Sequence, residues 1–312
     1  INFGQHTDFP GIDFKNADSP AALYRGASLS DLQVLSYNLS HGLQTDVEKY
    51  RAIYLWLCQN VDNDFGLFQE NQRMRIALRK KPKKLAEWNA NFNKRIFKTL
   101  REGHKTVCTG YAYLLKEMCY FAGINCEIVN GYGRTSTANV EEMGIGNHSG
   151  NAVQLNNKWY LSDPTWSAGA FYIFSGLKVF TADYNNGYFL CPPEHFFLNH
   201  YPLQKRWTLL DSSFNEAKFL NAPLVYGAAF KYGLYPSSEM DFHLELKVGE
   251  SLILDFEVKD TLNWEKLYFE LYTENKVLSF NPDDLQLENN LLSLKTSFSK
   301  GGAYDLHLKQ GE

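Results

Sequence analysis

The chain has 312 residues, of which 44% are hydrophobic, 15% aromatic and 21% charged, and its formal net charge is -4. This composition excludes an intrinsically disordered chain, and the small net charge gives no general attraction to nucleic acid or anionic membranes. Because no apolar run reaches the roughly 18 residues that a membrane-spanning helix needs, no membrane insertion is expected.

The five cysteines lie between Cys58 and Cys191. An odd number spread in this way is not the dense, even pattern of a small disulfide scaffold. The cysteines also lack the close pairs of a structural zinc site, and no loop has the spacing of calcium ligands, so neither a metal nor another cofactor is expected. The chain begins with Ile1 instead of methionine, which favours a processed protein in an extracytoplasmic location, secreted or periplasmic.

Residues 32–39 predict a first helix, because leucines recur there at helical spacing. Two serines precede it, Ser28 and Ser30, and either is a suitable N-cap. Gly42 then separates this helix from the next one.

The second predicted helix begins after Thr45. Glu48 follows three residues later, which is the pattern of a capping box. Apolar side chains continue at helical spacing from Ile53 to Val61, so this helix should bury one face.

Residues 66–104 are polar and basic. They include a cluster of positive side chains: Arg73, Arg75, Arg79, Lys80, Lys81, Lys83 and Lys84. Aromatic side chains do not alternate with these basic residues, as a surface that binds single-stranded nucleic acid would require. The solvated face of a helix-loop segment is therefore favoured over a nucleic-acid site, and no nucleic-acid partner is expected.

Cys108 lies in the stretch "KTVCTGYAYLLKEMCYFAGINCEIVNGYGR", at the point where a helix should begin, because apolar residues follow at helical spacing from Tyr111. A thiol at a helix N-terminus faces unpaired backbone N–H groups and the positive end of the helix dipole, which favour the thiolate. The same N–H groups can stabilise an oxyanion. Cys119 and Cys126 lie deeper in apolar sequence and are expected to be small, reduced core residues.

A histidine and an aspartate accompany this cysteine in "GIGNHSGNAVQLNNKWYLSDPTW". The segment alternates apolar and polar residues around Asn156-Asn157, which predicts a β-hairpin with a two-residue turn. In that register Asp163 faces Gly150, so His148 and Asp163 are diagonal neighbours on one face of the sheet, roughly 7–8 Å apart across the two strands. A carboxylate bound to one imidazole nitrogen would direct the other nitrogen towards a thiolate.

Each of these three residues has a simpler explanation when it is taken alone. A histidine near glycines is usually a surface or capping residue, and an aspartate before proline usually starts a turn. Together, a cysteine at a helix start and a His/Asp hairpin predict a nucleophile, a base and an orienting carboxylate.

The last third of the chain has a sequence pattern different from that of the first two thirds. The segments "FHLELKV", "SLILDFEV", "KLYFELY" and "AYDLHLK" alternate apolar and polar residues between turn signals, which predicts a β-sandwich of immunoglobulin type. We therefore predict two domains, residues 1–212 and residues 213–312. The β-sandwich could present a substrate or partner, or could brace the first domain, and the sequence does not decide between these roles.

The motifs of the first domain resemble the transglutaminase-like branch of the papain-like thiol enzymes. "VCTGYAYLLKEMCYFAGINCEIVNGY" is similar to the nucleophile helix and following strand of that family, and "NHSGNAVQLNNKWYLSDPTW" to its histidine and aspartate strands. "EKYRAIYLWLCQNVDND" resembles the preceding helix, and "FFLNHYPLQKRWTLL" the end of the domain in kyphoscoliosis-peptidase-like proteins. The resemblance covers about residues 28–210.

The resemblance implies an α+β fold, a papain-like core of N-terminal helices packed on an antiparallel sheet, followed by the immunoglobulin-like β-sandwich. It implies that Cys108 is the nucleophile, His148 the base and Asp163 the orienting residue. The family often carries a tryptophan two residues after the histidine, where this chain has Gly150, which predicts a less filled rim.

Candidates for a second oxyanion donor lie on the upstream helix: Trp56, Gln59 and Asn60. For each of them, packing is favoured over a role as oxyanion donor. His195 and His200, in "PPEHFFLNHYP", are interpreted as packing or turn residues and not as metal ligands.

A triad of this kind forms an acyl-enzyme from an amide of a protein or peptide substrate. Water as the acceptor gives a cysteine peptidase or amidase, and an amine gives a protein-crosslinking transglutaminase. Hydrolysis is favoured here because the second domain is a single sandwich without calcium-ligand loops. The alternative from another class is a catalytically weak or inactive scaffold that binds protein or glycan partners. The oligomeric state is left open.

Overall fold

The computed structural model describes residues 4, 8–9, 12–237, 240–258, 263–273 and 276–311. The chain divides into two compact units, residues 1–220 and residues 221–312. The domain boundary predicted from sequence, between 212 and 213, lies a few residues before this division. Among the described residues, no helix has the length and apolar character needed to cross a membrane.

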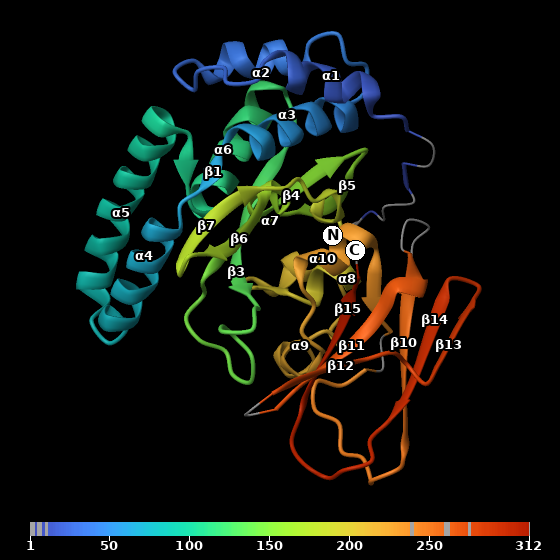
Figure 1. The fold of residues 1–312 in the computed structure, drawn as a ribbon. Helices are drawn as coiled ribbons and strands as arrows, with labels where there is room; N and C mark the ends of the chain where they lie inside the picture. The colour runs from blue at the N-terminus through green and yellow to red at the C-terminus, as the bar shows by residue number, and fades with distance from the viewer. Residues whose placement is uncertain are drawn as a thin grey trace. The chain divides into compact units, whose positions relative to one another are not determined.

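The first unit mixes helices with an antiparallel sheet (Figure 1). Its elements in chain order are α1 (Lys15–Leu23), α2 (Leu32–Ser40), α3 (Asp46–Asn60), β1 (Asp62–Asn63), α4 (Phe65–Leu78), α5 (Pro82–Gly103), β2 (Lys105–Thr106), α6 (Cys108–Phe121), β3 (Cys126–Gly133), β4 (His148–Leu155), β5 (Lys158–Ser162), α7 (Pro164–Ala168), β6 (Gly169–Phe174), β7 (Leu177–Ala182), η2 (Asn186–Tyr188), α8 (Pro193–Phe197), β8 (His200–Pro202), η3 (Lys205–Thr208) and α9 (Glu216–Asn221).

The ends of α2 and α3 are set by local hydrogen bonds. Asp31 caps α2 through its side chain, which accepts a bond from the N–H of Val34, so the predicted caps Ser28 and Ser30 were wrong. These serines come too early, because a side-chain cap must reach the second or third N–H of the first turn. The predicted capping box of α3, between Thr45 and Glu48, is confirmed.

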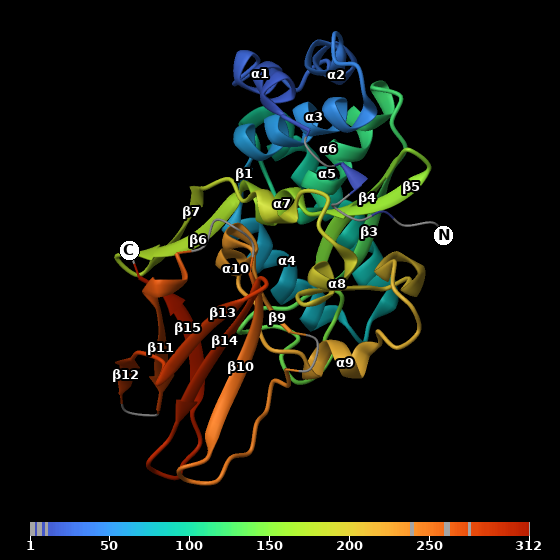
Figure 2. The ribbon, with the colours of Figure 1, turned by 90° about the vertical axis from the view of Figure 1, so that its right-hand side faces the viewer.

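Figure 2 shows helix α3 between α1 and α2 on one side and α6 on the other. Its apolar side chains share one buried cluster with side chains of α6 and of the hairpin β4–β5. Tyr54, Trp56 and Leu57 of α3 are completely buried. Because the cluster joins α3, α6 and the hairpin, it fixes the nucleophile helix against the strands that carry His148 and Asp163.

The main sheet of the first unit has the strand order β5-β4-β3-β8. The hairpin β4–β5 has the predicted register, with Asn151 facing Ser162 and Leu155 facing Lys158. Asn156 and Asn157 have φ angles of 48° and 62°, the left-handed values that a two-residue turn of this kind requires. Asn151 also donates a hydrogen bond of 2.9 Å to the carbonyl of Ala112, which ties α6 to the sheet.

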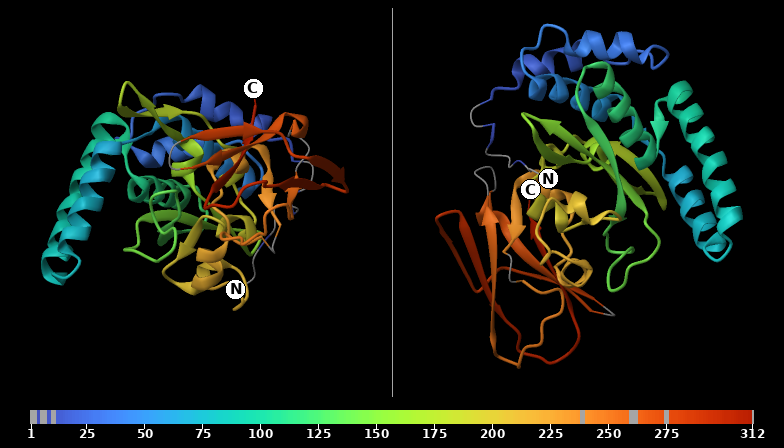
Figure 3. Two further views of the ribbon diagram at one scale, coloured as in Figure 1. Left: turned by 60° about the horizontal axis from the view of Figure 1, so that its bottom comes forward. Right: turned by 180° about the vertical axis from the view of Figure 1, so that it is seen from behind.

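The basic segment forms a pair of helices, α4 and α5, which Figure 3 shows from two further sides. Both helices pack around a small apolar cluster that includes Leu67, Phe92, Ile96 and Val107. Val107 is the residue immediately before Cys108. The helix pair is therefore anchored beside the start of α6.

The second unit contains two antiparallel sheets, with strand orders β13-β14-β10-β9 and β12-β11-β15. Its elements are α10 (Gly227–Tyr232), β9 (Leu234–Pro236), β10 (Ser251–Val258), η4 (Trp264–Lys266), β11 (Leu267–Tyr272), β12 (Val277–Phe280), β13 (Asp284–Glu288), β14 (Leu291–Ser297) and β15 (Asp305–Gln310).

Side chains of both sheets meet in one buried cluster, with Phe256 and Leu294 from one sheet and Phe269 from the other. Two sheets that share an apolar core are consistent with the expected β-sandwich. In immunoglobulin lettering the two sheets have the orders D-E-B-A and C′-C-F.

One strand predicted for this unit is wrong. "FHLELKV", residues 242–248, forms no strand, and its apolar side chains Leu244, Leu246 and Val248 are exposed. Alternating polarity predicts a strand only where a neighbouring strand pairs with the backbone, and residues 242–248 pair with none of the described strands.

The structure also shows the bonding state and the burial of the cysteines. No disulfide bond joins any of the five cysteines, all of which lie in the described part of the chain. Cys119 is completely buried and Cys126 is 4% exposed, so the prediction that both are reduced core residues is confirmed.

The turn between β4 and β5 provides a test of how the hairpin is held. Asn157→Val should lower the free energy of unfolding by about 1–2 kcal/mol, because a β-branched side chain disfavours the left-handed backbone at this position. Asn157→Gly is the matched control and should leave stability nearly unchanged, since glycine accepts this conformation. Urea unfolding measures both; equal stability of the two variants would contradict the proposed role of the turn.

Candidate active site

Cys108 is the first residue of α6. Val107 precedes it in an extended conformation as the N-cap. The N–H groups of Cys108 and Thr109 come before the first intrahelical hydrogen bond, so they are suited to stabilise negative charge near the thiol. The N–H of Gly110 already donates to the Val107 carbonyl at 2.8 Å. Gly110 allows this helix start, because a Cβ there would lie 1.9 Å from the Oγ1 of Thr106.

His148 is the first residue of β4 and lies beside Cys108. The two side chains are within hydrogen-bonding reach of one another. Asn147 holds the chain just before the histidine, because its side chain accepts from the N–H of Gly133 at 2.7 Å and donates to the carbonyl of the same residue at 3.0 Å. The thiol Sγ lies 4.0 Å from the Asn147 carbonyl oxygen.

Asp163 is completely buried at the end of β5, where it caps α7. Its Oδ1 accepts the N–H groups of Thr165 at 2.8 Å and Trp166 at 3.2 Å. Its Oδ2 lies 2.8 Å from His148 Nε2 and 3.0 Å from His200 Nε2. The carboxylate thus has four hydrogen-bond partners, which compensate for the loss of water.

The bond to Asp163 determines which imidazole nitrogen faces the thiol. Because His148 uses Nε2 for the carboxylate, Nδ1 is the nitrogen left for Cys108. The structure therefore brings together the three residues that the sequence singled out, in the order thiol, imidazole, carboxylate. This is the spatial order that nucleophilic catalysis needs.

His200 belongs to the same group. It is a packing residue, as the sequence indicated, but its contact with Asp163 was not expected. It lies on β8 next to β3, with Gly133 facing it across the ladder, and is 6% exposed. Its ring stacks on Phe196 at 3.9 Å between centroids, and its Nδ1 contacts the side-chain oxygen of Asn199 at 2.6 Å. A strand of three residues gives no periodic signal, so sequence spacing could not reveal this position.

Interactions within the group shift the pKa values of His148, Asp163 and Cys108. Burial would lower the pKa of His148, but the charge and hydrogen bond of Asp163, together with Cys108, raise it to about 10. Burial raises the pKa of the Asp163 carboxyl, yet the two imidazoles hold it well below the ordinary value. Burial likewise raises the pKa of the Cys108 thiol, but His148 outweighs this and the pKa is lowered. The lowered pKa of the thiol and the raised pKa of the imidazole both favour a thiolate–imidazolium pair beside the carboxylate of Asp163.

His200 takes the opposite protonation state. Burial lowers its pKa to about 4, despite its bond to Asp163. At neutral pH it is therefore a neutral ring with a single N–H, which can be donated to Asp163 Oδ2 or to the side-chain oxygen of Asn199 but not to both. Two histidines on one oxygen thus differ in charge, and only His148 faces the thiol.

His148, Asp163 and His200 offer atoms within 4.8 Å of one another, which is compatible with a metal site. Both imidazoles, however, direct the same nitrogen, Nε2, at a single carboxylate oxygen. A cation would have to replace both of these hydrogen bonds. The hydrogen-bonded network alone accounts for the orientation of all three side chains.

The candidates for a second oxyanion donor are placed on α3. Two of them are engaged elsewhere: Trp56 Nε1 donates to the Tyr24 carbonyl at 2.7 Å, and Asn60 Nδ2 donates to the Trp56 carbonyl at 2.7 Å. The oxygen of the Asn60 side chain accepts from the N–H of Gly26. Gln59 is exposed. These bonds give Trp56 and Asn60 a structural role at the end of α3.

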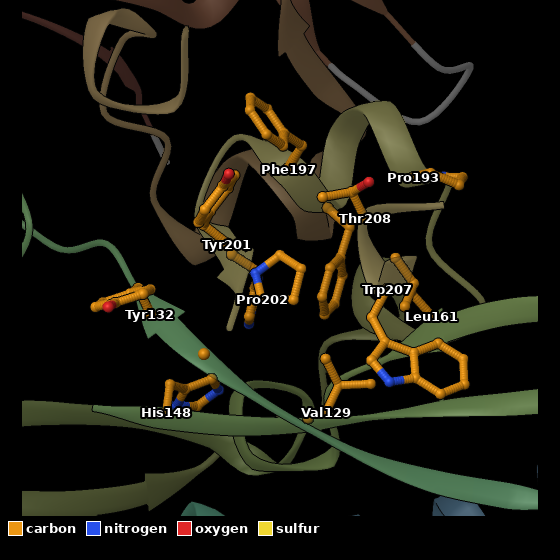
Figure 4. Close-up of a pocket in the computed structure, with 14 residues that line it drawn as sticks. Val129, Tyr132, His148, Leu161, Pro193, Phe197, Tyr201, Pro202, Trp207 and Thr208 are labelled. Atoms are coloured by element: carbon orange, nitrogen blue, oxygen red, sulfur yellow. The ribbon is translucent and has the colours of Figure 1, made fainter. Parts of the chain in front are cut away.

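The position of Gly150 does not open a large space. It lines a cavity of about 20 Å³, which has room for about one water molecule. Figure 4 shows that His148, Val129, Leu161, Trp207 and Tyr201 surround this cavity. A Cβ on Gly150 would lie 3.1 Å from the Ser162 carbonyl, so the neighbouring strand already fills the site of a larger side chain.

Comparison with known proteins relates the first unit to one superfamily. Residues 33–164 match the family model described as transglutaminase-like superfamily, and this range includes Cys108, His148 and Asp163. Human kyphoscoliosis peptidase is 33% identical over 194 residues, which are 62% of this chain and 26% of the relative. Hillarin of Drosophila melanogaster is 28% identical over 242 residues, 73% of this chain and 27% of the relative.

This chain therefore spans about a quarter of the length of the curated relatives it matches. A solved structure described as that of a TGase has a TM-score of 0.29 and 17% identity, and covers 59% of this chain and 40% of its own.

The neutral state of His200 predicts a pH dependence of stability. Its pKa is lowered to about 4 from 6.5, so between these pH values the unfolded chain binds a proton that the folded chain does not. Stability contributed by the neutral ring is therefore present above pH 6.5 and is lost as the pH falls towards 4. From pH 6.5 to about pH 5 the free energy of unfolding should fall by roughly 2 kcal/mol.

His200→Gln is the matched variant, because glutamine can donate to Asp163 but does not titrate in this range. Its unfolding free energy, measured in urea at both pH values, should fall less than that of the wild type. An equal fall in both proteins would show that His200 is not the group responsible.

Proposed function

Because the chain carries a transglutaminase-like domain of the kyphoscoliosis-peptidase-like branch, we propose that it is a thiol-dependent acyl-transfer enzyme that acts on amide bonds of proteins or peptides. Cys108 is the nucleophile, His148 the acid and base, and Asp163 the residue that orients His148. The observation that carries this proposal is the 2.8 Å bond from Asp163 to Nε2 of His148, which leaves Nδ1 for the thiol.

The first half of the proposed reaction forms an acyl-enzyme. The Cys108 thiolate attacks the carbonyl carbon of the amide, and the carbonyl oxygen becomes an oxyanion near the first N–H groups of α6. His148 then donates its Nδ1 proton to the leaving amine as the C–N bond breaks. A thioester on Cys108 and a neutral His148 remain.

The second half returns the enzyme to its resting state. Neutral His148 takes a proton from water, and the resulting hydroxide attacks the thioester carbonyl. The C–S bond breaks, the carboxylic acid product leaves, and the thiolate–imidazolium pair is restored. Asp163 is charged in the resting enzyme, because the charge and hydrogen bond of His148 and the hydrogen bond of His200 hold its pKa low.

We propose water as the acceptor, so the enzyme is a cysteine peptidase or amidase. Two observations support this choice: the name peptidase of the human and mouse relatives, and a second unit with a single pair of sheets. Transfer to an amine, as in protein crosslinking, uses the same acyl-enzyme and is the alternative acceptor. An extracytoplasmic location stays a prediction.

A scaffold that binds proteins without catalysis is the second candidate. Exposed apolar side chains on the hairpin β6–β7 favour it, since Ile173, Phe174 and Leu177 are 69%, 57% and 70% exposed. Such a surface suits a protein partner. A scaffold without catalysis, however, does not explain why His148 lowers the pKa of the Cys108 thiol.

Alkylation tests the ion pair directly. Cys108 should react with iodoacetamide well below the pH at which an ordinary thiol ionises, because its pKa is lowered. His148→Ala should shift the reaction to higher pH, and Cys108→Ala should abolish the label. Mass spectrometry of labelled peptides locates the reacted thiol, with buried Cys119 as the internal control. Labelling that follows an ordinary thiol titration in both the wild type and His148→Ala would favour the scaffold.

The acceptor is tested by digestion of a peptide library in isotopically labelled water with a fluorescent primary amine present. Hydrolysis should place the isotope in new carboxyl termini, and Cys108→Ala should form none. Incorporation of the amine in place of new termini would identify a crosslinking enzyme instead.

A further inference from the structure

His200 is the member of the group around Asp163 to which the proposed reaction gives no part. The ring is 6% exposed, and its Nε2 lies 3.0 Å from Oδ2 of Asp163. His148 contacts the same oxygen at 2.8 Å. Burying a polar ring costs free energy unless its nitrogens find partners, and here the carboxylate is such a partner.

The position of the His200 ring is fixed by its neighbours. Its backbone pairs with β3, where Gly133 faces it across the ladder. The ring stacks on Phe196, with 3.9 Å between centroids, and Trp166 and Tyr188 lie 4.5 Å and 6.0 Å away. Because aromatic rings enclose it, Nε2 stays directed at the carboxylate.

The contact at the other ring nitrogen determines where the single proton of the neutral ring lies. Nδ1 is 2.6 Å from the side-chain oxygen of Asn199. A carboxylate can only accept, whereas a half turn of the Asn199 amide presents its NH2 group to Nδ1 instead. The hydroxyl of Tyr188, 3.1 Å from Nδ2 of Asn199, can donate or accept and so suits either orientation. Both contacts of the ring are therefore satisfied when Nε2 carries the proton and donates it to Asp163.

Asp163 gains from His200 a donor that does not change during the proposed reaction. Its Oδ1 accepts from two backbone N–H groups at the start of α7, and its Oδ2 contacts the two imidazoles. His148 alternates between a charged and a neutral ring as it moves protons. Burial keeps His200 neutral, because its pKa is lowered to about 4. Oδ2 thus keeps one constant partner while the charge on His148 changes.

The two bonds at Oδ2 also restrict the direction in which the carboxylate points. With Oδ1 anchored at α7, Oδ2 could still swing about that anchor if only one ring held it. Two rings hold it instead, with 5.1 Å between their centroids. Because the bond to Oδ2 uses Nε2 of His148, restricting Oδ2 also restricts the position of Nδ1, the nitrogen left for Cys108.

We infer that His200 is a positioning residue of the triad, which donates to Oδ2 of Asp163 and thereby holds His148 with Nδ1 at the Cys108 thiol. This inference rests on the proposed function. It adds to the triad a fourth side chain that acts through Asp163 and does not itself touch the reacting atoms.

Two amide substitutions separate the contacts of the two ring nitrogens. In His200→Gln the NH2 group can lie where Nε2 lies, so a donor to Asp163 is kept. In His200→Asn the shorter side chain can place its NH2 group only where Nδ1 lies, so the contact with Asn199 is kept and the donor to Asp163 is lost. Both side chains are uncharged and do not titrate, so a difference between the two variants reports the bond to Asp163.

The measurement is the pH midpoint of iodoacetamide labelling at Cys108, located by mass spectrometry. In the wild type the midpoint should lie below that of an ordinary thiol, because His148 lowers the pKa of Cys108. His200→Asn should raise the midpoint by about one pH unit, because a less firmly held imidazole stabilises the thiolate less. His200→Gln should keep the midpoint close to that of the wild type.

Val129→Ala is the control for a purely structural effect. Val129 is buried and lines the cavity beside His148, so its truncation should lower the free energy of unfolding. It removes no polar contact of the triad and should leave the midpoint unchanged. Urea unfolding checks that each variant is folded. If His200→Asn does not fold, His200→Leu, which fills more of the same space and also lacks a donor, replaces it.

The outcomes separate the two proposals. If wild-type Cys108 has a low midpoint and His200→Asn shares it, the positioning role is wrong and the proposed function stands. An equal rise in His200→Gln and His200→Asn would also overturn the role, since the donor would not matter. A similar rise in Val129→Ala would do the same, since loss of packing would explain it. If wild-type Cys108 titrates as an ordinary thiol, the proposed function fails and the inference fails with it.

Discussion

The buried carboxylate of Asp163 is the group on which the candidate site depends. It has no exposure to solvent, and each of its oxygens has two hydrogen-bond partners. Removing any partner would leave a charged group partly unsatisfied in the interior. One oxygen is fixed by the start of α7, so the other must face the imidazoles. The orientation of His148 follows from that constraint.

Packing supplies the remaining part of the geometry. The cluster shared by α3, α6 and the hairpin β4–β5 holds the thiol-bearing helix against the strand of His148. The bond from Asn151 to the Ala112 carbonyl adds a polar connection at the same interface. The thiol lies at the start of α6 and the imidazole at the start of β4. Side chains on helices and strands are positioned more precisely than side chains on loops.

Charge is distributed unevenly around this geometry. Within the triad, Asp163 favours the charged form of His148, and His148 in turn favours the thiolate of Cys108. A neutral His200 completes the group without adding charge, because burial prevents its protonation. The two histidines that contact one carboxylate thus have different electrostatic roles.

Sequence alone determined the features that depend on residues close together in the chain. The capping box of α3, the Asn156-Asn157 turn and the resulting approach of His148 to Asp163 follow from local backbone preferences and the period-two alternation of strands. Only the tertiary structure decided that His200 shares the carboxylate, that α4 lies beside Cys108 and that residues 242–248 form no strand. These depend on contacts between distant segments, whose burial and pairing leave no periodic mark in the local sequence.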